Sequence, residues 1–117
     1  MKNVSKNTDE VDWNTRGNKQ LVAGILVIKN ADEAKRFLRD LMTRGEIQEF
    51  ANRLEAASLL SRDVQYNAII ESTGLSSTTI ARISKWFKGS LGGYRLILSR
   101  ISNHHNSSQL RKGLHLS

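Results

Sequence analysis

Residues 66–83 constrain the fold of this chain more than any other segment. They read as a short helix containing Ile69 and Ile70, a turn at Gly74, and a second helix that begins after Ser76. Glycine tolerates the positive φ of a tight turn, and a serine hydroxyl can accept hydrogen bonds from the free N–H groups of a first helical turn. The segment therefore predicts a helix-turn-helix, whose second helix can lie in the major groove of DNA.

The predicted second helix has two different faces. Ile80, Ile83 and Phe87 recur at helical spacing and define its inner face. At about 100° per residue, the opposite face carries short, hydroxyl-bearing or cationic side chains and no carboxylate: Thr78, Ala81, Arg82 and Lys85, with Ser77 at the flank. Such a face can approach DNA bases and tolerates phosphate. The same pattern also occurs in αα-hairpins whose polar face is only solvated.

The excess of positive charge lies entirely after residue 71. The chain has 18 Lys and Arg against 11 Asp and Glu, a net charge of +7. Residues 1–71 hold 11 basic and 11 acidic side chains, whereas residues 72–117 hold seven basic ones and no acid. Lys and Arg supply most of the sequence-independent affinity for DNA. A membrane surface would also attract this segment, but residues 91–101 lack the two faces of a strong interfacial helix.

Hydrophobic periodicity predicts an all-α chain of about six helices. One helix runs over residues 13–28, a second follows Asn30, and a third follows Thr43. Asn30 and Thr43 each precede a glutamate by three residues, as in a capping box. A glycine-rich break at residues 89–93 separates the helix-turn-helix from a last helix near Tyr94.

We expect one helical domain at residues 13–101, between a flexible arm at residues 1–12 and a flexible tail at residues 102–117. The sequence has neither a long apolar run nor a secretion leader, so we expect no membrane association. The absence of cysteine fits a reducing, cytoplasmic location. The apolar helix faces exceed what one small core can bury, which favours a homodimer with two reading helices.

Neither an enzyme nor a metal site is expected. His104 and His105 are adjacent and would point apart on a helix, and no acidic residue follows Glu71 to complete a metal site. The sequence contains no phosphate-binding loop, no nucleophile elbow, and no paired carboxylates in an identifiable cleft. We therefore expect no catalytic residues and no bound metal.

The central segments resemble the Trp-repressor superfamily, in particular its YerC/YecD branch. The resemblance runs from about Leu21 to Leu98. It rests on residues 28–33, 38–43, 51–54 and 66–82, and on the Gly92-Gly93-Tyr94 segment that follows the second helix. It implies an all-α, intertwined homodimer that binds operator DNA as a bacterial transcriptional regulator, most simply a repressor.

The resemblance also implies which residues contact DNA. Ser77, Thr78 and Ala81 stand where the Trp repressor reads its operator, where many base contacts run through water. Spacing, charge and resemblance together predict nine DNA-binding residues: Asn67, Ser76, Ser77, Thr78, Thr79, Ala81, Arg82, Lys85 and Lys88.

A ligand pocket follows from the resemblance alone. Thr43, Arg53 and Arg82 match positions that line the tryptophan site of the Trp repressor. Ile83, however, stands where the repressor has a glycine, and Trp86 where it has a serine that helps to hold the ligand's amino group. These bulky side chains would crowd the cavity, so we expect no cofactor and no response to tryptophan. The two arginines would then form an ion pair or contact phosphate, with a ligand site as the alternative.

Two other functions stay open on the sequence. The basic half could dock on an acidic protein partner, which would make the chain a helical protein-interaction module. It could also bind nucleic acid without sequence preference.

Within the helix-turn-helix, Ile70 stands at a position where alanine is common. Its larger side chain requires either a wider crossing of the two helices or an orientation toward solvent.

Overall fold

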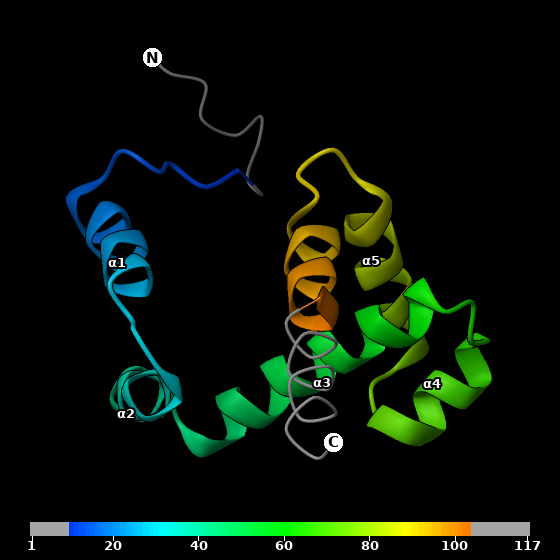
Figure 1. Cartoon of the computed structure of the whole chain (residues 1–117). Coiled ribbons are helices and arrows are strands. Elements are labelled where there is room, and N and C mark those ends of the chain that lie inside the picture. Colours follow the sequence, from blue (N-terminus) through cyan, green and yellow to red (C-terminus); the bar gives the residue numbers. More distant parts are fainter. Residues whose placement is uncertain (1–9, 104–117) are drawn as a thin grey trace, which may run out of the picture. The chain divides into compact units, whose positions relative to one another are not determined.

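The computed structural model describes residues 10–103 (Figure 1). All regular secondary structure in this part of the chain is helical, which confirms the predicted all-α class. The helices are α1 (Arg16–Leu26), α2 (Ala31–Leu41), α3 (Arg44–Ser61), α4 (Tyr66–Thr73), α5 (Ser77–Lys88) and a further helix at residues 93–103. The chain divides between Leu41 and Met42 into two compact units.

The predicted arm and tail lie largely outside the described residues. Residues 1–9 and 104–117, which include all three histidines, belong to this remainder. The last helix continues through residues 102 and 103, the first two residues of the predicted tail. The predicted single domain at residues 13–101 stays a prediction.

The first unit contains α1 and α2. α1 begins at Arg16 and not at Trp13, because the Thr15 hydroxyl accepts a hydrogen bond from the Asn18 N–H at 3.1 Å and so caps the helix. α1 and α2 approach each other closely at Gly24, where an added Cβ would lie 3.2 Å from the Phe37 ring. Neither helix contains a buried residue.

The predicted caps of α2 and α3 form, with one difference. Thr43 makes a complete capping box: its hydroxyl accepts from the Glu46 N–H at 3.1 Å, and the Glu46 carboxylate accepts from the Thr43 N–H at 2.9 Å. Asn30 accepts from the Glu33 N–H at 2.9 Å. The Glu33 carboxylate accepts instead from the N–H of Lys29, one residue before the cap. Hydrogen bonds between side chains and backbone N–H groups three or four residues away therefore fix both helix starts.

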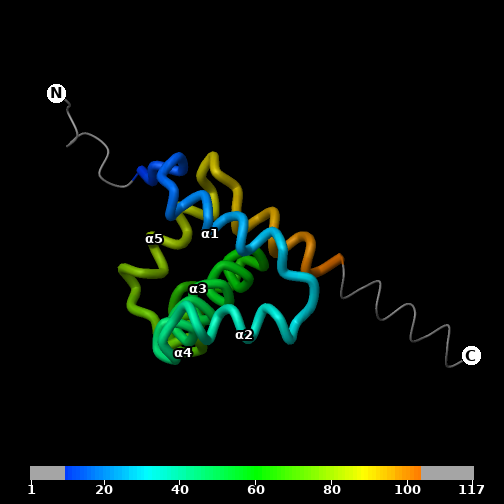
Figure 2. Tube along the Cα trace, turned by 90° about the vertical axis from the view of Figure 1, so that its left-hand side faces the viewer, coloured from blue at the N-terminus to red at the C-terminus, as the bar shows by residue number. Residues whose placement is uncertain are grey.

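The second unit has a small core between α3, α4 and α5. These three helices contact one another, and Figures 1 and 2 show them together from two directions. The fully buried apolar residues are Ala56, Ala57, Ile69, Ile80 and Ile83. Ile70 packs partly buried against this cluster, so its side chain does not turn outward. The alanines of α3 leave room for the isoleucines of the helix-turn-helix.

Candidate nucleic-acid interface

Hydrogen bonds within four residues fix the turn between α4 and α5. Gly74 adopts a φ of 76°, and its N–H donates to the carbonyl of Ile70 at 2.8 Å. The buried Thr73 hydroxyl donates to the Ile69 carbonyl at 2.7 Å and accepts from the Leu75 N–H at 3.2 Å. These bonds satisfy the backbone where α4 ends, and the left-handed conformation favours glycine at this position.

Ser76 caps the start of α5, as predicted. Its hydroxyl accepts from the Thr79 N–H at 3.1 Å and donates to the Thr79 hydroxyl at 3.0 Å. The Thr79 side chain is thereby held against the cap and is half-buried. Of the predicted DNA-binding residues, Ser76 and Thr79 therefore have a structural role at the helix start.

α5 is anchored on one face and exposed on the other. Ile80 and Ile83 are fully buried, and Ser84 is 6% exposed. The opposite face carries the exposed residues that spacing predicts: Ser77, Thr78, Ala81, Arg82 and Lys85. Lys88, the last residue of α5, and Asn67, in the first turn of α4, are also exposed. The structure thus brings the predicted DNA-binding residues together on the helix-turn-helix.

All charged side chains on the exposed face of α5 are cationic. Within residues 72–103 the charged side chains are Arg82, Lys85, Lys88, Arg95 and Arg100, all of them exposed, and none is acidic. Lys85 and Lys88 lie in the last turn of α5, where positive charge also interacts favourably with the helix dipole. An anionic backbone would therefore meet no repelling carboxylate along this helix.

Arg95 secures the end of α5, a role that the sequence reading missed. Its guanidinium donates to the carbonyl of Phe87 and, at 3.0 Å, to the carbonyl of Gly89. Gly92 has a φ of 70°, and a Cβ there would lie 3.0 Å from Nη2 of Arg95. The glycine pair before Tyr94 thus lets the chain turn back so that Arg95 can reach the free carbonyls of α5.

The residues predicted from resemblance to line a ligand pocket have separate roles in this unit. The Thr43 hydroxyl caps α3, and Arg82 is exposed on α5. Arg53 pairs with Glu49 through Nη2 and Oε2 at 2.9 Å, and its guanidinium lies 5.5 Å from the centre of the Phe50 ring. Its Nε is buried without a hydrogen-bond partner among residues 10–103. A ligand site formed by these three side chains stays a prediction.

Tyr94 follows the turn and packs against the core. Burial raises the pKa of its phenol above the ordinary value of 10.0, because the phenolate is poorly solvated there. The positive charge of Arg53 acts in the opposite direction and lowers the pKa, but less strongly. Tyr94 and Arg53 therefore interact electrostatically between the last helix and α3.

Residues 10–103 offer neither a membrane span nor a metal-binding cluster. None of the helices in this part of the chain has the length and apolar character that a membrane span requires. The same residues contain no group of three or more histidine, cysteine or acidic side chains that could hold a metal ion.

Comparisons with known proteins agree with this architecture. Residues 16–102 match the family model described as Trp repressor protein. The "Uncharacterized protein YerC" of Bacillus subtilis (strain 168) is 36% identical over 89 residues, which span 76% of this chain and 86% of that protein.

Solved structures show the same similarity. A TrpR-like protein from Eubacterium eligens ATCC 27750 superposes with a TM-score of 0.72 at 33% identity, over 77% of this chain and 93% of that one. A structure from Staphylococcus aureus gives a TM-score of 0.70 at 30% identity, over 75% of this chain and 88% of that one. On the family match and these similarities, the chain belongs to the Trp-repressor superfamily, in its YerC branch.

Proposed function

We propose that this protein is a sequence-specific DNA-binding transcriptional regulator, a cytoplasmic repressor that acts as a homodimer through its helix-turn-helix. The observation that carries the proposal is the orientation of α5. Its isoleucines are fully buried, while Thr78, Ala81, Arg82 and Lys85 are exposed on the opposite face. Membership of a family of helix-turn-helix regulators supports the same function and argues against an enzyme.

The side chains on α5 divide into two groups by chemistry. Ser77, Thr78 and Ala81 are short, so the helix backbone can come close to base edges, directly or through water. Arg82, Lys85 and Lys88 carry the charge that would bind phosphates and position the helix. Asn67, in the first turn of α4, would add a phosphate contact beside them, while Ser76 and Thr79 hold the helix start.

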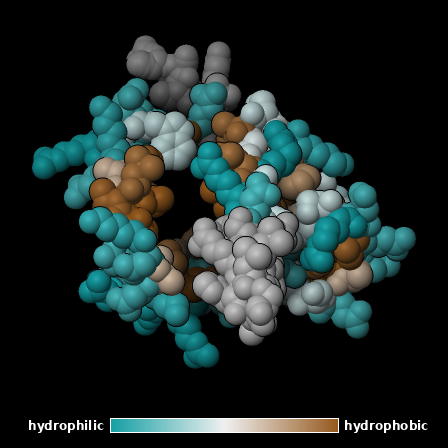
Figure 3. All heavy atoms as spheres, viewed as in Figure 1, coloured by the Kyte–Doolittle hydropathy of each residue, from teal (hydrophilic) through white to brown (hydrophobic). Residues whose placement is uncertain are grey.

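Exposed apolar surface supports the homodimer. α1 and α2 contain no buried residue, and Figure 3 shows apolar atoms exposed over α1. Ile25, Leu26 and Val27 are 56%, 77% and 68% exposed. In the second unit, Leu91 is 95% exposed. Burial of such surface against a second copy is strongly favourable. A two-fold dimer would also present two α5 helices to two half-sites about one turn of DNA apart.

We further propose that tryptophan is not the effector. Ile83 is fully buried in the core of its own unit, so it cannot move aside for a ligand. Trp86 stands where the Trp repressor offers a serine, and Arg53 is already engaged by Glu49. Calorimetric titration of the protein with tryptophan should show no binding heat. Tight binding would mean that Thr43, Arg53 and Arg82 form a ligand site after all.

Gel-shift titrations at increasing salt test the proposed DNA contacts. Thr78→Ala should reduce the difference in affinity between specific and unrelated duplexes, because Thr78 faces the bases. Lys88→Ala should weaken binding to all duplexes alike and lower the salt slope by about one unit. Lys35→Ala, on the exposed surface of α2, is the matched control and should leave both quantities unchanged.

Equal affinity of the wild-type protein for all sequences would refute the proposal and leave a non-specific binder. Failure to bind DNA at all would favour the protein-interaction module.

A further inference from the structure

Arg95 binds the end of α5 with both terminal nitrogens of its guanidinium. Nη1 donates to the carbonyl of Phe87, and Nη2 donates to the carbonyl of Gly89 at 3.0 Å. The last carbonyls of an α-helix have no partners within the helix. These two bonds, here called the Arg95 clamp, therefore close the C-terminal end of α5 from a neighbouring helix.

The helix that carries Arg95 is itself held by the core. It begins after Gly92, whose carbonyl accepts from the Leu96 N–H at 2.9 Å. Tyr94 and Leu98 of this helix pack against the buried core residues. Arg95 lies between these two packed residues in the sequence, so the clamp ties the end of α5 to a helix whose position the core determines.

The two ends of α5 are held by different contacts. Burial of Ile80 and Ile83 and the cap at Ser76 fix the first two turns. In the last turn, residues 85–88, Phe87 is partly buried and the other three side chains are exposed. Helix ends fray when their backbone groups lack partners. The Arg95 clamp supplies such partners where packing is weakest.

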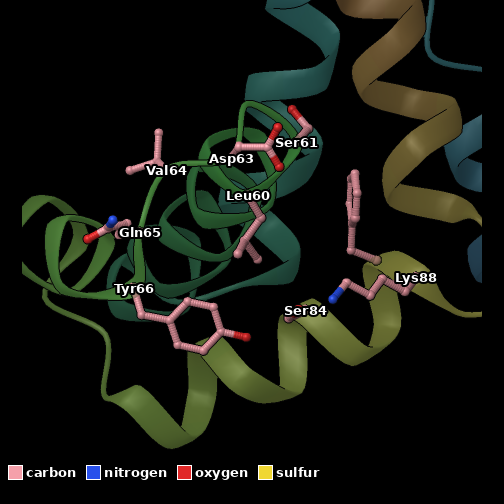
Figure 4. A pocket seen from close by; sticks show the side chains of 9 residues that line it. Leu60, Ser61, Asp63, Val64, Gln65, Tyr66, Ser84 and Lys88 are labelled. Carbon is pink, nitrogen blue, oxygen red and sulfur yellow. The ribbon is translucent and has the colours of Figure 1, made fainter.

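Lys85 and Lys88 lie in this last turn and belong to the proposed phosphate contacts. Figure 4 shows Lys88 at the edge of an open hollow lined by residues of α3, α4 and α5. Because its side chain borders open space, the backbone of the last turn sets where its amino group can reach. Phosphate contacts fix the register and orientation of a protein on a duplex. A frayed last turn would therefore misplace these contacts while the first two turns stay folded.

We propose that Arg95 is a positioning residue for DNA recognition, an inference that rests on the proposed function. It holds the last turn of α5 so that Lys85 and Lys88 meet phosphates in register, and it does not itself contact DNA. Its guanidinium is directed at two carbonyls of the protein. The alternative role of an exposed arginine beside α5 is a direct phosphate contact, which depends on its charge.

Arg95→Lys separates the two roles, because it keeps the charge and removes the planar fork. A lysine ammonium is a point charge and cannot bridge two carbonyls as a guanidinium does. Gel-shift titrations use the genomic fragment that the wild-type protein binds most tightly. On this fragment Arg95→Lys should bind on the order of tenfold more weakly, with a salt slope lower by about two units, one for each displaced lysine. Wild-type affinity and slope in Arg95→Lys would overturn the proposal.

Arg100 provides the matched control on the same helix. It is exposed, and Arg100→Lys makes the same exchange of a guanidinium for an ammonium. This variant should change neither the affinity nor the salt slope. An equal effect of Arg100→Lys and Arg95→Lys would show that the clamp is not what matters.

A general loss of stability is separated from positioning by a double-mutant cycle. The variant Lys85→Ala with Lys88→Ala lacks the side chains through which Arg95 is proposed to act. In that background Arg95→Lys should cause no further loss of affinity or salt slope, since coupled residues do not contribute additively. An equal loss of affinity in both backgrounds would show that Arg95→Lys lowers the folded fraction, and would overturn the positioning role.

Hydrogen exchange tests the clamp without DNA. The Gly89 N–H donates to the Trp86 carbonyl at 3.1 Å, in the segment that Arg95 holds. In Arg95→Lys this N–H should exchange on the order of tenfold faster than in the wild-type protein, whereas the N–H of Ile80 should exchange at an unchanged rate. Equal exchange of the Gly89 N–H in both proteins would refute the clamp.

Failure of this inference is distinguishable from failure of the proposed function. Absence of a specific complex with the wild-type protein would refute the proposed function and the positioning role with it. A specific wild-type complex that Arg95→Lys leaves unchanged would refute only the positioning role.

Discussion

Gly92 and Arg95 together determine how the chain leaves α5. Gly92→Ala places a side chain at a φ of 70° and 3.0 Å from Nη2 of Arg95, so it should lower the free energy of unfolding by about 1–2 kcal/mol. Gly93→Ala is the matched control, because a Cβ at Gly93 would meet no atom within 4 Å. Urea denaturation of both variants measures the difference. Equal stability of the two would mean that Arg95 does not need the turn at Gly92.

Tyr94 gives the protein a specific sensitivity to alkaline pH. Its pKa in the folded state is raised above 10.0, so the unfolded chain loses the phenol proton first as the pH increases. The contribution of Tyr94 to stability is therefore fully present below about pH 10 and is lost as the pH rises through the folded-state pKa. Tyr94→Phe should show a smaller loss of stability as the pH is raised above about 10 in denaturant titrations. An identical decline in both proteins would contradict the assigned pKa shift.

At the scale of single residues, local interactions could be predicted from the sequence and tertiary ones could not. The caps at Thr43 and Ser76 each join a hydroxyl to an N–H three residues later, and the sequence predicts both residues as helix caps. Arg95 bonds to carbonyls six and eight residues earlier, across a turn that spacing alone does not define.

At the scale of elements, the two faces of α5 should respond differently to substitution. Ile80→Ala opens a cavity in a small core and should lower the free energy of unfolding by about 2–5 kcal/mol. Thr78→Ala, two residues earlier on the exposed face, should change it by less than about 0.5 kcal/mol and alter only DNA preference. Thermal or urea denaturation measures both. Comparable destabilisation by the two substitutions would mean that Thr78 is not free to face a duplex.

The bounds of the elements were predictable wherever a cap marks them. α2 and α3 begin one residue after their predicted caps, and α5 begins directly after Ser76. α1 begins three residues later than Trp13. The prediction placed the start at an apolar residue that fits the hydrophobic spacing, whereas the Thr15 cap determines where the helix begins. Apolar spacing identifies which face of a helix is buried, whereas hydrogen bonds to side chains determine where the helix begins.

At the scale of the whole molecule, the exposed apolar residues of α1 should hold two copies together. Ile25→Glu introduces a charge into this surface and should shift the mass measured by light scattering from dimer toward monomer. Gln20→Glu adds the same charge at a neighbouring exposed polar position and should leave the dimer intact. A wild-type protein that is monomeric would exclude the dimer. A dimer that tolerates Ile25→Glu would place the dimer interface elsewhere.

If the proposed function is right, α5 reads duplex DNA as one of a symmetric pair. Footprinting of the full-length protein on genomic fragments, at physiological salt, tests it most directly. The wild-type protein should protect one palindromic segment whose half-sites are centred about 10 base pairs apart. Thr78→Ala should abolish the sharp edges of this protected segment. Uniform protection along every fragment, or a protected segment that Thr78→Ala leaves unchanged, would contradict it.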